Sequence, residues 1–229
     1  MSNKSVQRPG VREGYDAWST TYDETPNPLV ALDRRYTMDL LHPRPSERIL
    51  DAGCGTGAHL WMILHAGGSP FGLDLSRGML RVARRRLPSV PLAQADLDAP
   101  LPVRGRVFDA VLCALVGEHL ENVSQLFREF SSSLVAGGRL VFSVFHPEMA
   151  AAGIEANFER EGVEYRLGAN RQRVDDYVDA VDRSGFENVR VHEFCGDEAL
   201  VDEIPWAAKY LRQPLLLGVE ANKSSRAAV

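Results

Sequence analysis

The sequence has few of the features that mark secreted, membrane-spanning or metal-binding proteins. Its three cysteines, Cys54, Cys113 and Cys195, lie far apart, so their spacing gives neither a disulfide framework nor a zinc site. No window approaches about eighteen uncharged apolar residues, and the first residues lack the apolar core of a signal peptide. We therefore expect a cytoplasmic protein with no membrane partner and no metal.

A basic surplus is also absent. The chain carries 26 Lys and Arg against 31 Asp and Glu, whereas binding to phosphate backbones needs Lys and Arg gathered on one face. The basic run at residues 81–86 is short, and we interpret it as a solvated helix face. Nucleic acid is therefore not expected as a partner.

Apolar residues make up 45% of the 229 residues, which is enough for one sizeable core. Apolar runs alternate with helix-periodic segments, and this pattern predicts an α/β fold around a parallel sheet. Strands are expected at residues 48–51, 70–74, 91–96, 108–115, 139–145, 186–194 and 214–220. Helices are expected at residues 29–41, 59–66, 77–86, 123–134 and 175–184, after a loose polar tail at residues 1–12.

The strongest local signal is the segment at residues 49–58, where an apolar strand ends in Asp51 and a glycine-rich turn leads into a helix. Gly53, Gly55 and Gly57 let the backbone turn tightly and approach a ligand, toward which the helix directs free N–H groups. Residues 53–58, which we call the glycine loop, also satisfy the dinucleotide fingerprint of dehydrogenases as Gly53-x-Gly55-x-x-Ala58. Asp51 favours a different ligand, because its carboxylate repels a pyrophosphate and attracts an ammonium group.

The sequence Asp-Ala-Gly-Cys-Gly-Thr-Gly at residues 51–57 resembles motif I of the class I S-adenosylmethionine (SAM)-dependent methyltransferases. The resemblance extends over nearly the whole chain and implies a doubly wound, mostly parallel seven-stranded sheet with a small lid. It also implies SAM as the cofactor, with the acid of the motif near the methionine amino group and the glycines beneath the ligand.

Two further acids follow predicted strands. Asp74 ends the second strand, where a carboxylate can accept both ribose hydroxyls, and Gly72-x-Asp74-Leu75-Ser76 resembles motif II of the family. Ala95-Asp96-Leu97 resembles motif III, whose acid takes the adenine amino group while a neighbouring backbone N–H reads the ring. The predicted cofactor-binding residues are Tyr15, Tyr22, Asp51, Gly53, Cys54, Gly55, Asp74, Leu75, Met79, Asp96 and Leu97.

An aromatic segment precedes the sheet. Tyr15, Trp18 and Tyr22 recur at spacings of three and four, which predicts one face of a short helix that either closes the core or covers the ligand. The repeated Tyr-Asp pair resembles the N-terminal segment of ubiquinone-type and other small-molecule methyltransferases, in which such tyrosines cover the sulfonium and the substrate. We assign residues 12–42 to an N-terminal helical cap.

Two histidines follow the fourth and fifth strands and are candidate general bases. His119 projects from the carboxyl end of a buried strand, where doubly wound sheets bind ligands, and its ordinary pKa lies near neutrality. It is either a base or a wall of the substrate site. His146 is the second candidate, although a histidine before a proline also shapes the turn.

Residues 147–171 do not belong to a minimal doubly wound sheet, and their two polar-apolar runs around Gly162 predict a hairpin. We interpret this insertion as a lid that carries substrate choice, with Phe158, Tyr165 and Arg166 as wall residues, or alternatively as an oligomer contact. The remaining core is assigned to residues 46–146 and 172–222 of a single domain, in a monomer or a homodimer.

These features together predict an enzyme that transfers the methyl group of SAM to an oxygen, nitrogen or carbon atom of a small molecule. A non-catalytic SAM-binding module, a methyltransferase acting on a macromolecule and a nicotinamide-dependent reductase are the alternatives. The reductase is disfavoured by Asp51. A macromolecular acceptor is disfavoured by the absence of a basic extension and of a base-flipping motif in this sequence.

Overall fold

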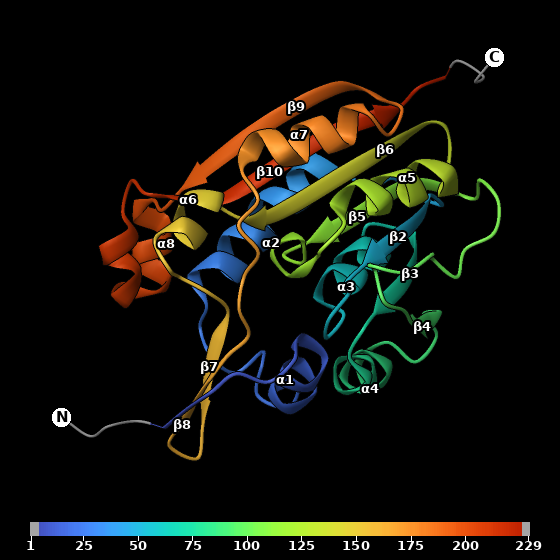
Figure 1. Cartoon of the computed structure of the whole chain (residues 1–229). Coiled ribbons are helices and arrows are strands. Elements are labelled where there is room, and N and C mark those ends of the chain that lie inside the picture. The colour runs from blue at the N-terminus through green and yellow to red at the C-terminus, as the bar shows by residue number, and fades with distance from the viewer. Residues whose placement is uncertain (1–4, 226–229) are drawn as a thin grey trace.

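The structure, a computed structural model, describes residues 5–225 and contains a seven-stranded sheet flanked by helices (Figure 1). The strand order is β4-β3-β2-β5-β6-β10-β9, and the first five of these strands are parallel, whereas β10 is antiparallel to both of its neighbours. The doubly wound α/β fold is thereby confirmed. The strands are β2 (Arg48–Ala52), β3 (Ser69–Asp74), β4 (Leu92–Gln94), β5 (Phe108–Ala114), β6 (Leu134–Phe145), β9 (Phe186–Cys195) and β10 (Pro214–Lys223).

Helices cover both faces of this sheet because its central strands are apolar on both sides. On β5, Ala110 and Leu112 pack in one cluster with Leu41 of α2 and Ile63 of α3, whereas Val111 faces the opposite cluster. The first face is covered by α2 (Pro28–Leu41), α3 (Ala58–His65) and α4 (Arg77–Arg86), and the second by α5 (Val123–Ser133) and α7 (Val174–Asp182).

The sequence also determines where these helices start. Asn27 caps α2, Ser76 caps α4 and Asn122 caps α5, each accepting a hydrogen bond from a backbone N–H of the first turn. Strand order reverses between β2 and β5, which lie side by side although β3 and β4 separate them in the chain. The crevice for a ligand is therefore expected above the carboxyl ends of β2, β3 and β5.

A second, three-stranded sheet lies to one side of the first. The expected hairpin is present as β7 (Asn157–Arg160) and β8 (Val163–Arg166), which pair antiparallel. The prediction of a loose tail is wrong for residues 5–7, because β1 (Ser5–Gln7) pairs in parallel with β8, whereas residues 1–4 lie outside the described residues. The N-terminal segment is therefore joined to the lid through backbone hydrogen bonds.

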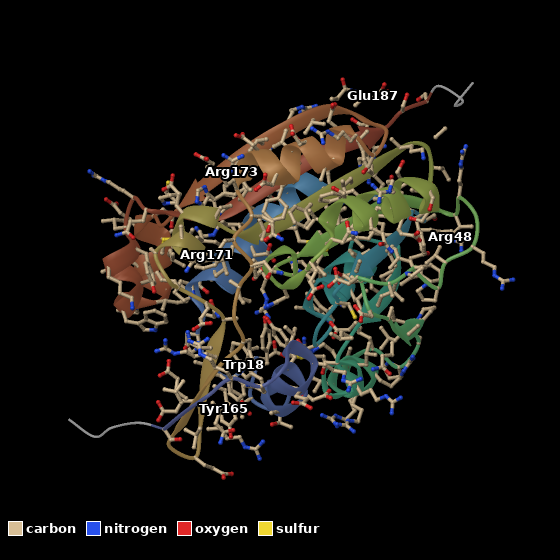
Figure 2. The ribbon with its side chains drawn as sticks, in the orientation of Figure 1. Trp18, Arg48, Tyr165, Arg171, Arg173 and Glu187 are labelled. Atoms are coloured by element: carbon tan, nitrogen blue, oxygen red, sulfur yellow. The ribbon has the colours of Figure 1, made fainter. Side chains whose placement is uncertain are left out.

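Aromatic rings join this small sheet to α1 (Val11–Trp18). Trp18 stacks on Phe158 with ring centroids 4.9 Å apart, and Phe158 stacks on Tyr165 at 4.8 Å. Figure 2 shows Trp18 and Tyr165 where α1 meets the hairpin. The remaining elements are α6 (Pro147–Ala151), α8 (Glu198–Glu203) and two 3-10 helices, η1 (Gly117–His119) and η2 (Pro205–Tyr210). No helix among residues 5–225 is long and apolar enough to cross a bilayer.

Candidate active site

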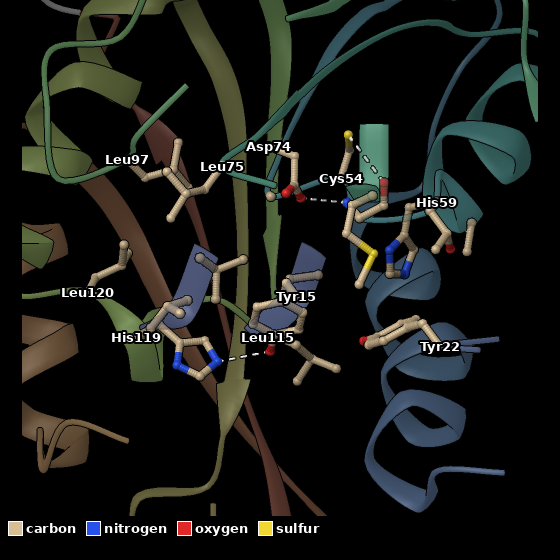
Figure 3. Close-up of a pocket in the computed structure, with 18 of the residues that line it drawn as sticks. Tyr15, Tyr22, Cys54, His59, Asp74, Leu75, Leu97, Leu115, His119 and Leu120 are labelled. Atoms are coloured by element: carbon tan, nitrogen blue, oxygen red, sulfur yellow. Dashed lines mark hydrogen bonds between the residues drawn. The ribbon is translucent and has the colours of Figure 1, made fainter. Parts of the chain in front are cut away.

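Two neighbouring cavities lie at the carboxyl ends of the central strands. The first, of about 310 Å³, is lined by the glycine loop and by residues that follow β3 and β5, and we call it the glycine-loop cavity. The second, of about 690 Å³, lies between the segment that follows α1 and the hairpin strand β7, and we call it the hairpin cavity. Figure 3 shows the residues around the first cavity.

The structure brings most of the predicted cofactor-binding residues to one place. Those that line the glycine-loop cavity are Tyr15, Tyr22, Gly53, Cys54, Gly55, Asp74, Leu75, Met79, Asp96 and Leu97. His119 lines the same cavity. Asp51 does not line it, and its carboxyl lies buried at the base of the glycine loop. Elements far apart in the sequence therefore converge on this cavity.

The glycine loop needs glycine for two different reasons. Gly53 has a φ of +90°, and a Cβ atom there would lie 2.2 Å from Cγ2 of Val116, so a side chain has neither the conformation nor the space. At Gly55, with a φ of +53°, an added Cβ atom would meet nothing within 4 Å. The first glycine thus lets the loop pack against the segment after β5, and the second leaves the space in front of it open.

Asp74 holds the glycine loop in place. Its Oδ2 accepts a hydrogen bond from the Gly55 N–H and its Oδ1 accepts one from the Ser76 N–H, both at 2.8 Å. Burial nevertheless raises the pKa of this carboxyl to about 6, because the cavity wall shields it from water. Each oxygen still has accepting capacity for a ligand hydroxyl.

Asp51 is an unpartnered carboxylate at the base of the loop. The residue is 1% exposed, and neither carboxylate oxygen has a hydrogen-bond partner among the described residues. Burial raises the pKa of this carboxyl well above its usual range, and the charges of Asp74 and Asp33 raise it further. A buried carboxylate without a partner costs folding free energy, so this position is suited to a cation that the chain itself does not supply.

Asp33 and His59 are site residues that the sequence analysis missed. Both line the glycine-loop cavity, and Asp33 Oδ2 lies 3.3 Å from His59 Nε2. The other oxygen of Asp33 accepts hydrogen bonds from the hydroxyls of Thr37 at 2.6 Å and Ser143 at 2.5 Å. Burial lowers the pKa of His59, against the opposing effect of the Asp33 charge. This end of the cavity thus presents the buried carboxyl group of Asp33.

The two aspartates of the repeated Tyr-Asp pair anchor the N-terminal segment over the cavity. Asp16 Oδ1 accepts hydrogen bonds from the Ser76 hydroxyl and the Gly78 N–H, both at 2.6 Å. These bonds outweigh the effect of partial burial and lower the pKa of Asp16. Asp23 pairs with Arg86 at 2.8 Å and accepts from the Thr56 hydroxyl at 3.1 Å. In each Tyr-Asp pair, therefore, the tyrosine lines the cavity and the aspartate tethers the segment to the rest of the fold.

Tyr15 and His119 share a hydrogen bond across the cavity, with 2.9 Å between the Tyr15 hydroxyl and His119 Nε2 (Figure 3). Burial lowers the pKa of His119 to about 4 and raises the pKa of Tyr15 well above its usual range, so both side chains are neutral near pH 7. The geometry shows His119 as the side chain that orients Tyr15. Its role as a base stays a prediction.

His146 lines neither cavity. It is 1% exposed and caps α6, where its Nδ1 accepts a hydrogen bond from the Glu148 N–H at 3.3 Å. On the other side of the ring, Nε2 lies 3.4 Å from Glu193 Oε1. The structure therefore places His146 outside the lining of both cavities, in the capping position that a histidine before a proline favours.

Four residues line both cavities, namely Tyr15, Tyr22, Val30 and Leu115. Leu115 follows β5 with a φ of +55°, and its N–H donates to the Ser143 carbonyl at 2.9 Å. A leucine in the left-handed region is strained, and such strain concentrates at functional sites. This shared wall is where molecules in the two cavities would come together.

Comparison with known proteins agrees with this geometry. A model described as a methyltransferase domain matches residues 50–142, which include the glycine loop and β6 up to Phe142. The chain is 29% identical to the demethylmenaquinone methyltransferase of Tropheryma whipplei over 62% of each chain, so it spans less than two thirds of that relative. It is 26% identical to aklanonic acid methyltransferase DauC of Streptomyces sp. strain C5, over 79% of this chain and 93% of the relative.

A solved SAM-dependent methyltransferase from Mesorhizobium loti superposes with a TM-score of 0.72 and 29% identity, covering 83% of this chain and 97% of that one. The chain thus has a methyltransferase domain match over residues 50–142 and the fold of the class I SAM-dependent methyltransferases. The methyltransferase fold thus accounts for the strand order, the glycine loop and the acid that ends β3.

The residues that line the glycine-loop cavity, with Asp51 beneath them, fit SAM on the evidence of the structure itself. The orphaned carboxylate of Asp51, with Asp33 nearby, matches the ammonium of the methionine part, and Asp74 matches a pair of ribose hydroxyls. The open space in front of Gly55 leaves room for a ligand to lie against the backbone.

The pKa of Asp74 leads to a testable pH dependence. Because the folded pKa of about 6 lies above the ordinary value, the ligand-free protein holds an extra proton between about pH 4 and 6, and its free energy of unfolding falls as pH rises through that window. Hydroxyl and ammonium donors favour the ionised carboxylates. We therefore expect S-adenosylhomocysteine (SAH) to bind more tightly as pH rises from about 5 to 7, with release of protons.

Isothermal titration calorimetry in two buffers of different ionisation enthalpy measures this proton release. The Asp74→Asn variant is the matched control, since its amide does not titrate, and we expect it to release fewer protons. An SAH affinity that stays constant from pH 5 to 7, with no proton release in wild type, would contradict the assignment of the carboxylates.

Proposed function

We propose that this methyltransferase transfers the methyl group of SAM to a small molecule bound in the hairpin cavity. The observation that carries the proposal is the shared wall of Tyr15, Tyr22, Val30 and Leu115. A donor held by the glycine loop and an acceptor held under the hairpin would meet there. When bound, SAM supplies an electrophilic sulfonium methyl and leaves as SAH after the acceptor has taken the methyl.

The residues of the chain have the tasks of alignment and exclusion of water. Tyr15, oriented by His119, and Tyr22 close the cavity from the N-terminal side, and the tethers of Asp16 and Asp23 hold them there. Stacking of Trp18 on Phe158 closes the space between α1 and the hairpin. We assign Asp51, Asp74 and Asp96 as the acids that hold the cofactor.

Two further observations support a small acceptor. The hairpin cavity, at about 690 Å³, falls within the range of roughly 300–1,000 Å³ typical of small-molecule sites. The relatives described above are named for small molecules, demethylmenaquinone and aklanonic acid. A net charge of -5 gives no general attraction for nucleic acid.

Ligand-induced stabilisation followed by product analysis tests the proposal. We expect SAM and SAH at a hundredfold excess over Kd to stabilise the protein by about 2.7 kcal/mol. This corresponds to a rise in Tm of about 5–10 °C, whereas NAD and NADP leave Tm unchanged. Stabilisation by NAD or NADP instead of SAM would contradict the proposal. Binding of SAM without SAH production from any hydroxyl, amine or carbon acceptor would favour the non-catalytic alternative.

A further inference from the structure

The hairpin cavity contains one buried carboxylate that the proposed function does not use. Glu118 lies in η1, directly after β5 and beside His119, and it lines the hairpin cavity but not the glycine-loop cavity. The residue is 5% exposed, and its Oε2 has no hydrogen-bond partner within residues 5–225. Its neighbour His119 lines the glycine-loop cavity, so two adjacent residues of η1 line different cavities.

A buried carboxylate without a partner destabilises the folded protein, because its desolvation costs free energy that no hydrogen bond recovers. Burial raises the pKa of Glu118 to about 7, and the charge of Asp33 contributes in the same direction. The other titratable groups whose pKa values its charge helps to raise are the hydroxyls of Tyr15, Tyr22 and Tyr177 and the thiol of Cys113. Glu118 is therefore the group in this surrounding that changes charge near neutrality.

The wall around Glu118 is otherwise largely apolar and aromatic. The large side chains that line the hairpin cavity include Trp18, Phe145, Met149, Phe158, Trp206 and Tyr210. Ring-lined walls of this kind favour a flat, ring-containing molecule, and a single buried acceptor oxygen selects a donor group on it. Of the other carboxylates of the wall, Glu155 is paired with Arg8 at 2.9 Å, and Glu24 and Glu159 are exposed.

Resting on the proposed function, we infer that Glu118 binds a hydroxyl group of an aromatic acceptor in the hairpin cavity and takes its proton. The location supports this role, because Glu118 is close enough to the shared wall for its charge to raise the pKa values of Tyr15 and Tyr22. His119 Nε2 is occupied by the Tyr15 hydroxyl, whereas Oε2 of Glu118 is unpaired.

The proton step balances within the acceptor and the side chain. The O–H bond of the acceptor breaks, its proton moves to Glu118 Oε2, and its electron pair stays on the acceptor oxygen, which becomes the nucleophile. The resulting carboxylic acid returns the proton to water after the product leaves. No oxidant, reductant or metal is required for this step.

Binding of 2-naphthol and its methyl ether, 2-methoxynaphthalene, to the protein saturated with SAH tests the inference without relying on turnover. We expect wild type to bind the naphthol at least about tenfold more tightly than the ether, which is the effect of one charge-assisted hydrogen bond. The Glu118→Leu variant should bind both compounds about equally. Glu148→Gln, an exposed glutamate outside both cavities, is the control and should keep the preference.

The pH profile and the rate give two further readouts. Naphthol affinity of wild type should rise between about pH 5.5 and 8 as Glu118 ionises, and it should be flat in Glu118→Gln. Methylation of the naphthol by Glu118→Gln should be slower than wild type by about a hundredfold or more, with SAH affinity within twofold. The Gln variant also covers the case in which the Leu variant does not fold.

The outcomes separate this inference from the proposed function. Failure of wild type to bind SAH overturns the proposed function itself. Normal SAH binding without a naphthol preference, or a preference that persists in Glu118→Leu, overturns the assignment of Glu118. A wild type that prefers the naphthol but never methylates it, or a Gln variant that methylates it at the wild-type rate, overturns the proton-transfer role.

Discussion

The Asp51→Asn variant is expected to melt at a higher temperature than wild type and to bind SAH more weakly. Without ligand, the Asp51 carboxylate is buried and has no partner, so an amide of the same shape removes an uncompensated charge. We expect a gain of about 1–2 kcal/mol in the free energy of unfolding and a rise in Tm of about 2–8 °C. With ligand, the charge-assisted bond to the ammonium is lost, which weakens binding about 10- to 100-fold.

The sign of the stability change depends on pH in a way that identifies its cause. Burial raises the folded pKa of Asp51, so wild-type stability falls as pH rises from the ordinary pKa toward the folded value, whereas an asparagine does not titrate. The difference in Tm between variant and wild type should therefore be larger at pH 8 than at pH 5. Differential scanning calorimetry at both pH values measures it.

Asp202→Asn provides the matched control, because Asp202 is exposed on α8 and lines neither cavity. The control should leave both Tm and SAH affinity close to the wild-type values. A lower Tm for Asp51→Asn in the ligand-free protein would show that a partner for this carboxylate exists, and the account of the unpaired acid would then be wrong. Such opposite effects on stability and binding are typical of functional sites.

Much of the sheet could be predicted because its signals are local. The apolar runs that become β2, β3 and β5, and the caps Asn27 and Ser76, need only neighbouring residues to be recognised. β1 could not be predicted in this way. Ser5–Gln7 is short and exposed, and it becomes a strand only because β8 lies beside it, about 160 residues later in the chain.

The residues of the candidate site also differ in whether local sequence is enough to predict them. The glycine loop and Asp74 form a local motif whose spacing alone indicates a ligand. Asp33 looks like a polar position of an amphipathic helix, and Glu118 looks like an ordinary loop acid. Their burial and, for Glu118, the lack of a partner arise only when distant elements pack together. His146 is the opposite case. Its position directly after a strand is a local signal for a site residue, but in the folded chain its side chain lines neither cavity.

The Gly53→Ala variant is expected to lose more stability than any other single methyl added to the glycine loop. The new Cβ atom would lie 2.2 Å from Cγ2 of Val116, a branched side chain that cannot move away freely, and the φ of +90° disfavours any side chain. Overpacking and backbone strain together should cost about 3 kcal/mol or more, which lowers Tm by about 6–12 °C. SAH affinity should fall with it, because the loop shifts.

Two further variants separate the two causes. Gly55→Ala also places a side chain at a positive φ, but its Cβ atom meets nothing within 4 Å, so it should lower Tm by only a few degrees. Val116→Ala combined with Gly53→Ala removes the clashing methyl groups and should recover part of the lost stability, leaving the backbone strain. Thermal melting of the four proteins of this double-mutant cycle measures the coupling. If Gly53→Ala melts within about 2 °C of wild type, or if Val116→Ala restores nothing, the close packing of the loop against the segment after β5 is not what requires glycine at this position.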